Sequence, residues 1–207
     1  SGATVVIANP NAQTGIALPP SAIEEIVKNN AQNVVVVDEA YVDFGASSCV
    51  PLTKKYDNLL VVRTMSKSGA LAGARVGYCV GNGELIADLN TIKYSFNPYN
   101  VGTLAQAVGA AAARDGEYYA EKTAMVRKNR DMLCRGLDEL KMSYLPSLAN
   151  FVLAKAEGRS GEELYRALKE RGVLVRHFGG RIADYIRITI GSSEEMKELL
   201  CRLKEIL

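Results

Sequence analysis

The stretch LLVVRTMSKSGALAGARVGY, residues 59–78, begins with a run of apolar residues and then changes to small and hydroxylated residues around a single lysine, Lys67. A continuous apolar run of strand length is typical of a parallel strand that is covered on both faces. TVVIA at 4–8 and VVVVDEAY at 34–41 have the same character, and RVGYCVG at 75–81 is a fourth candidate strand. Helical or loop segments separate these runs. The first half is therefore predicted to form an α/β fold with a doubly wound, mainly parallel sheet.

The second half is predicted to be helical at first and to end in a small α+β domain. Helical spacing of apolar residues predicts three successive helices, near residues 83–94, 103–114 and 117–141. The remainder reads as strand, helix, strand, strand and helix. Ser160 with Glu163 and Ser192 with Glu195 have the spacing of capping boxes, as do Ser21 and Glu24 in the first half. We place the domain boundary inside the long helix, which gives a partial large domain at 1–125 and a small domain at 126–207.

Composition limits the classes of function. The chain has 207 residues, enough to bury a core, and its net charge of +2 gives no reason to expect nucleic acid as a partner. The four cysteines contain no C-x-x-C pair, so we expect free thiols in a reducing compartment, the cytoplasm. The single histidine makes a histidine-based metal site improbable, so no metal is predicted. No apolar segment reaches the roughly 20 residues of a membrane helix, and the start has no signal-peptide pattern.

Polar residues follow three successive predicted strands. NPNAQTG follows the first strand, DEAY ends the second and TMSK ends the third. Ligands of open parallel sheets bind beyond the carboxyl ends of the strands, and neighbouring strands lie about 4.8 Å apart. Asp38 and Lys67 would therefore face one small, flat molecule from two sides. Each would be costly to bury alone and needs a charged partner or a ligand.

Two nucleotide motifs are excluded. A phosphate-binding loop of the G-x-x-x-x-G-K-[ST] type would need glycine at positions 61 and 66, where the chain has Val61 and Ser66. Gly15 lies in no G-x-G-x-x-G pattern, so a dinucleotide fingerprint is also missing.

A second possibility is a lysine that forms a Schiff base with a carbonyl cofactor such as pyridoxal 5'-phosphate. This cofactor needs a lysine for its aldehyde, a carboxylate for its ring nitrogen and a donor for its ring oxygen, which Lys67, Asp38 and Tyr41 can provide. It also needs hydroxyls and an arginine for its phosphate, and the candidates are Thr64, Ser66 and Arg75.

These motifs, together with YIRITIG at 185–191, resemble the fold-type I pyridoxal-phosphate aminotransferases of class I and II, and within them the histidinol-phosphate aminotransferases. The resemblance implies that Lys67 is the Schiff-base lysine and moves the proton of the reaction. It also implies that Arg187 binds the α-carboxylate of the substrate with Asn150 beside it, and that Arg176 is a weaker candidate for the substrate's phosphate. An amino donor, a 2-oxo acid and a homodimer are the implied partners.

The chain departs from the family in two places. The family's glycine turn usually reads N-N-P-T-G, whereas Ala12 stands at the second asparagine and Gln13 at the proline. We expect Asn11 to take over the missing asparagine's contact with the cofactor. The family chain also normally begins far upstream, so the part that precedes Ser1, including one wall of the cofactor site, is expected to be missing.

Several alternatives stay open at this point. An aromatic aminotransferase or a threonine-phosphate decarboxylase would share Lys67 and Asp38, and a catalytically incomplete fragment is a hypothesis of a different class. Asp38 and Asn150 could instead cap local backbone, Lys67 could be a solvated surface residue, and Arg187 could form an ordinary surface salt bridge.

Overall fold

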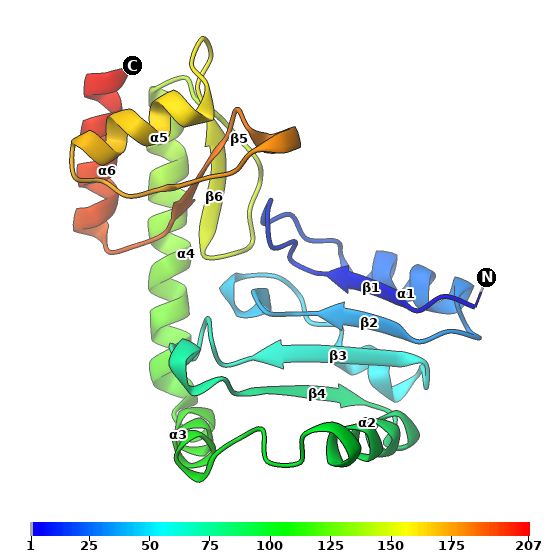
Figure 1. Cartoon of the computed structure of the whole chain (residues 1–207). Helices are drawn as coiled ribbons and strands as arrows, with labels where there is room; N and C mark the ends of the chain where they lie inside the picture. The colour runs from blue at the N-terminus through cyan, green and yellow to red at the C-terminus, as the bar shows by residue number, and fades with distance from the viewer. Residues whose placement is uncertain (1) are drawn as a thin grey trace.

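The computed structural model describes residues 2–207 and contains two sheets joined by a long helix (Figure 1). The first sheet has four strands in chain order, β1 (Val5–Ala8), β2 (Val35–Asp38), β3 (Leu59–Thr64) and β4 (Gly77–Gly81). The first three strands are parallel and β4 pairs antiparallel with β3. The predicted α/β fold with a mainly parallel sheet is confirmed.

Helix α1 (Pro20–Asn29) places its buried residues Ile23 and Val27 against the first sheet. Pro20 stands in the first turn, where its missing N–H costs no helical hydrogen bond. Val35, Val37, Leu59 and Val61 complete the core below β2 and β3. The continuous apolar runs thus supply the buried strands of this sheet.

Two short 3-10 segments follow β2 before β3 begins. They are η1 (Val42–Phe44) and η2 (Val50–Lys54). Gly45 ends η1 with φ of 128°, a backbone conformation that strongly favours glycine. The loop after β3 contains a third such turn, η3 (Ala72–Ala74).

Helices α2 (Gly83–Phe96), α3 (Thr103–Arg114) and α4 (Gly116–Glu139) follow β4. Figure 1 shows α4 rising from the level of β4 to the second sheet. Near its C-terminal end, Leu133 and Leu137 are fully buried in the core of the second sheet. One helix therefore packs against both parts of the molecule, and our boundary between residues 125 and 126 stays a prediction.

The second sheet has the strand order β5-β6-β8-β7 and is antiparallel throughout. Its strands are β5 (Ser143–Tyr144), β6 (Phe151–Lys155), β7 (Arg176–His177) and β8 (Ile186–Thr189). Helices α5 (Gly161–Glu170) and α6 (Ser193–Ile206) contribute apolar residues to the core of this sheet, and a short turn, η4 (Gly180–Ile182), precedes β8. Two of the three predicted capping boxes are present, because the side chains of Ser160 and Ser192 accept from the N–H groups of Glu163 and Glu195. The third, Ser21 with Glu24, is wrong, because α1 begins one residue earlier, at Pro20, and its N-cap residue Pro19 has no side-chain acceptor. The two-residue strand β5 was not predicted.

Among residues 2–207, no helix combines the length and the apolar character that crossing a membrane would require. The same residues contain no group of three or more His, Cys, Asp or Glu side chains that could hold a metal ion. All four cysteines are free thiols.

Candidate functional site

The loops after the three parallel strands carry the predicted site residues to one edge of the first sheet. Asp38 pairs with Ala8 on one side and with Val62 on the other, so β1 and β2 end side by side while β3 continues to Thr64. Figure 1 shows the arrowheads of β1, β2 and β3 directed toward α4. Parallel pairing thus brings together residues that are far apart in the sequence.

Lys67 lies in the loop after β3 and its Nζ atom is 5.2 Å from the centroid of the Tyr41 ring. Tyr41 is buried and its ring meets that of Phe151 edge to face, with the centroids 5.3 Å apart. Lys67 is exposed and forms no ion pair within residues 2–207. An ammonium held only by an aromatic face remains available to bind another group.

Asp38 is the last residue of β2 and is partly buried. Its Oδ1 atom accepts a hydrogen bond of 2.9 Å from the N–H of Ala40, which fixes the start of the loop to Tyr41. A carboxylate has further lone pairs after one such bond. Asp38 can therefore cap its own loop and still accept a hydrogen bond from a ligand.

The three predicted phosphate ligands form one connected cluster. Thr64 donates its hydroxyl to the Oγ of Ser66 at 2.9 Å, and Arg75 donates Nη1 to the same oxygen at 3.4 Å. Arg75 has φ of 54° and also binds the carbonyl of Ala72, so the loop itself holds the guanidinium in place. Hydroxyls and a guanidinium that converge on one point can bind a phosphate.

A glycine makes this loop possible. The N–H of Leu71 donates to the carbonyl of Met65, which folds the loop back on itself. A Cβ atom on Gly69 would lie 2.8 Å from the carbonyl oxygen of Met65. Any side chain at position 69 would push this loop open.

Arg187 reaches from β8 to the loop after β1. Its Nη1 atom donates to the carbonyl of Ala12 at 3.1 Å, and its guanidinium carbon lies 4.7 Å and 5.1 Å from the ring centroids of Phe151 and Phe178. Its Nε atom is buried and has no hydrogen-bond partner within the described residues. An unpaired buried donor is costly unless a ligand supplies an acceptor.

Arg176 stands beside Arg187, because the two residues are register partners on β7 and β8. Its guanidinium carbon lies 5.4 Å from the Phe178 ring, so both cations contact the same aromatic residue. Like charges directly opposite each other on neighbouring strands are destabilising. An anionic ligand between them would relieve that repulsion.

The other two predicted residues have mainly structural contacts. The main-chain carbonyl of Asn150 accepts from Ile190 and ties β6 to the end of β8. The Oδ1 atom of Asn11 accepts from the N–H of Gln13, and from the N–H and hydroxyl of Thr14 at 3.0 Å each. Ala12 contributes a main-chain carbonyl to Arg187.

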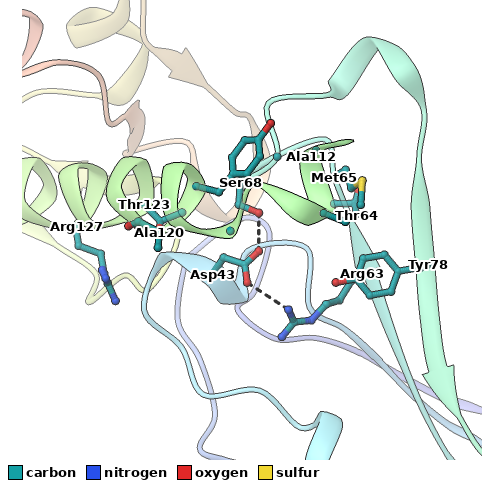
Figure 2. A pocket seen from close by; sticks show the side chains of 14 residues that line it. Asp43, Arg63, Thr64, Met65, Ser68, Tyr78, Ala112, Ala120, Thr123 and Arg127 are labelled. Carbon is teal, nitrogen blue, oxygen red and sulfur yellow. Dashed lines mark hydrogen bonds and ion pairs between the residues drawn. The ribbon is translucent and has the colours of Figure 1, made fainter. Parts of the chain in front are cut away.

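Sequence reasoning missed a buried polar cluster behind the Lys67 loop. The Glu39 side chain is fully buried, and its Oε2 atom is 3.0 Å from Nη2 of Arg63, whose Nη1 atom is 3.3 Å from Oδ1 of Asp43. Figure 2 shows Asp43 between Arg63 and the hydroxyl of Ser68, which donates to it. This cluster joins the loops that carry Tyr41 and Lys67. The adjacent carboxylates of the DEAY motif were the available signal for it.

Electrostatics within this cluster follow from burial. Burial acts to lower the pKa of the Arg63 guanidinium, but the hydroxyl of Tyr78 and the carboxylates of Asp43 and Glu39 outweigh it, so the pKa is raised overall. Burial, helped by Glu39, raises the pKa of the Cys49 thiol to about 11. Arg63 thus stays charged and Cys49 stays protonated at neutral pH.

A cavity of about 450 Å³ lies beside this cluster, between the Lys67 loop and α4 (Figure 2). Arg63, Ser68, Tyr119 and Arg127 are among the residues that line it. Of the predicted site residues within 2–207, Thr64 alone lines this cavity. The other predicted cofactor contacts therefore lie outside this cavity.

Comparison with known proteins identifies what the chain is similar to. The family model described as Aminotransferase class I and II matches residues 2–203. Histidinol-phosphate aminotransferase 1 of Bradyrhizobium diazoefficiens is 50% identical over 204 residues, which are 98% of this chain and 58% of that relative. The chain thus spans less than two thirds of the length of this relative.

Solved structures have the same fold. The histidinol-phosphate aminotransferase of Clostridium acetobutylicum superposes with a TM-score of 0.89 at 28% identity, over 98% of this chain and 63% of that one. That of Sinorhizobium meliloti, solved in complex with pyridoxal-5'-phosphate, has a TM-score of 0.83 at 23% identity, over 99% of this chain and 58% of that one. At that identity the second structure supports the fold alone.

Proposed function

Because the chain belongs to the aminotransferase class I and II family, we propose that its protein is a pyridoxal-phosphate-dependent aminotransferase that acts on histidinol phosphate, with glutamate and 2-oxoglutarate as the second substrate pair. The observation that carries the proposal is the arrangement around Lys67. Its ammonium lies against Tyr41 without an ion pair in residues 2–207, and the cluster of Ser66, Thr64 and Arg75 starts at the neighbouring residue.

The residues present fit this cofactor. Asp38 would hold its ring nitrogen, Tyr41 its ring oxygen and Lys67 its aldehyde, while the three-residue cluster would bind its phosphate. Asn11 is a further candidate for the ring. When bound, pyridoxal phosphate supplies an aldehyde that takes up the substrate's amino group. Its ring withdraws electrons from the substrate carbon that bears this group.

Lys67 has the central task in this proposal. Its Nζ atom would hold the aldehyde. Once the substrate's amino group has taken its place, the freed amine would move a proton from the carbon that bears the amino group to the former aldehyde carbon, on the other side of the nitrogen. The Tyr41 ring, whose centroid lies 5.2 Å from Nζ, would keep the lysine beside this place.

Arg187 would bind the α-carboxylate of glutamate or 2-oxoglutarate. Its buried, unpaired Nε and the flanking Phe151 and Phe178 rings favour a planar anion that approaches edge-on. Asn150 directly precedes β6, the strand that pairs with β8, and would assist Arg187 in binding this carboxylate. Arg176, the register partner of Arg187, would bind the phosphate of histidinol phosphate. Two adjacent cations suit a carboxylate substrate and a phosphate substrate that bind in turn.

Exposed apolar side chains gather on α2 and α3, where Ile92, Phe96 and Leu104 have exposed fractions of 64%, 90% and 79%. We propose that this protein forms a homodimer, which would cover such a surface. The four free thiols support a reducing compartment such as the cytoplasm.

The test is chemical trapping on the purified protein. It is incubated with pyridoxal phosphate, reduced with borohydride and digested, and the modified peptide is identified by mass spectrometry. We expect the label on Lys67 and its loss in Lys67→Arg, which keeps the charge. A label on any other lysine would contradict the site. Absence of transamination between histidinol phosphate and 2-oxoglutarate, with glutamate and an aromatic amino acid tested alongside, would contradict the substrate.

A further inference from the structure

We propose that Arg130 is a positioning residue that sets the placement of Lys67 relative to Arg187. This inference rests on the proposed function for the roles of those two residues. Arg130 lies on α4 and is 7% exposed. It touches neither candidate, so it would act through the residues between them.

Arg130 joins two loops from different parts of the molecule. Its Nη1 atom donates to the carbonyl of Phe44, in η1, at 2.9 Å and to the carbonyl of Ala149, before β6, at 2.8 Å. Both hydrogen bonds within the described residues therefore go to neutral main-chain oxygens. A buried guanidinium with only neutral acceptors is costly, and burial lowers the pKa of Arg130.

The two acceptors belong to the small apolar cluster that separates the candidate residues. Phe44 and Ala149 pack with Tyr41 and Phe151. Tyr41 and Phe151 meet edge to face, and each supports one candidate, since Lys67 lies 5.2 Å from the Tyr41 ring and Arg187 lies 4.7 Å from the Phe151 ring. A shift of either loop would therefore change the distance between the proposed proton-transfer and carboxylate-binding groups.

The backbone at Gly45 allows this approach. Gly45 has φ of 128°, and a Cβ atom there would lie 3.5 Å from Nη2 of Arg130 and 3.4 Å from Cδ of Arg127. The turn after Phe44 therefore lies directly against the guanidinium. The neighbouring residue Asn129 is tied to the C-terminal part instead. Its Nδ2 atom donates to the carbonyl of Gly191, and its Oδ1 atom accepts from the hydroxyl of Ser193.

The experiment compares Arg130→Met, which removes both donors, with Arg130→Lys, which keeps a charged donor. Asn58→Ala is the matched control, because Asn58 also donates to main-chain carbonyls, but all of them lie in the first part. They are the carbonyls of Val27, Asn30 and Asn33. Hydrogen exchange is followed at the amides of Gly45 and Leu148, and at Val37 and Leu153 in the strands. Leu148 reports on the junction because its N–H donates to the carbonyl of Gly15 at 2.8 Å.

We expect Arg130→Met to raise exchange about tenfold at Gly45 and Leu148 and to leave the strand amides unchanged. We expect kcat with glutamate to fall about 10- to 100-fold, as for a displacement on the order of 1 Å, while the affinity for pyridoxal phosphate changes less than about twofold. Arg130→Lys should recover most of both losses, and Asn58→Ala should change neither.

Unchanged exchange at the junction, or an equal rise at the strand amides, would overturn the inference. So would a wild-type kcat in Arg130→Met. If the wild-type protein takes up no pyridoxal phosphate, the proposed function fails separately. In that case the exchange pattern by itself decides whether Arg130 joins the two loops.

Discussion

Lys67 and Tyr41 meet across two loops, with the ammonium 5.2 Å from the ring centroid. They follow neighbouring parallel strands, so the sheet places them side by side, and the Asp43 carboxylate ties the same two loops together through Arg63 and Ser68. The position of the lysine is therefore set by contacts around it rather than by a carboxylate bound to it.

Removal of the Tyr41 hydroxyl separates packing from chemistry. In Tyr41→Phe the ring keeps its edge-to-face contact with Phe151, so we expect the free energy of unfolding to change by less than about 1 kcal/mol. The absorbance of bound pyridoxal phosphate should change its pH dependence, because the ring oxygen loses a donor. Spectrophotometric pH titration measures this. An unchanged titration would show that Tyr41 does not contact the cofactor.

Replacement of Arg187 by lysine tests whether carboxylate binding needs a planar guanidinium. Arg187→Lys keeps the charge but loses the aromatic stacking and the forked donors. We expect KM for glutamate to rise about 100-fold, which corresponds to roughly 2.7 kcal/mol, with a smaller effect on kcat. Steady-state kinetics provide the measurement, and Arg181→Lys, an exposed arginine in η4, is the control. Equal effects of the two substitutions would contradict the assignment.

The buried ion pair behind the site should contribute to stability. In Glu39→Ala, Arg63 loses its main partner and the N–H of Cys49 loses its acceptor. We expect the free energy of unfolding to fall by about 3 kcal/mol. The exposed pair of Glu162 and Arg166 is the control, and Glu162→Ala should cost less than about 1 kcal/mol. Urea unfolding measures both, and similar costs would contradict the role of burial.

The raised pKa of the Cys49 thiol leads us to expect a lower free energy of unfolding at alkaline pH. Its pKa is about 11 in the folded protein and near the ordinary 9.0 when unfolded, so between these values the folded state retains a proton that the unfolded state has lost. Stability therefore falls as the pH rises through this window. Unfolding in urea should show a steeper decline for the wild type than for Cys49→Ala. Cys201→Ala, at an exposed position, should follow the wild type, and parallel curves for all three would refute the prediction.

Local patterns in the sequence determined the elements of this protein and the chemical character of its site. Continuous apolar runs made β2 and β3 buried parallel strands, and two capping boxes set the starts of α5 and α6. The serine, lysine and arginine of one loop were recognisable because their partners are near in sequence, as in the bond from Arg75 to Ser66. Such features depend on residues a few positions apart, where the backbone leaves little choice.

Tertiary structure alone decided the contacts that connect distant segments. Arg187 and Ala12 are 175 positions apart and Arg130 and Phe44 are 86 apart, and neither contact has a pattern in the chain. Both exist because α4 contacts η1 of the first part, packs into the core of the second sheet and brings β6 and β8 over the loops of the first sheet. The sequence specifies which side chains can bind an anion or donate to a carbonyl. Their distances are set by how the two cores pack together.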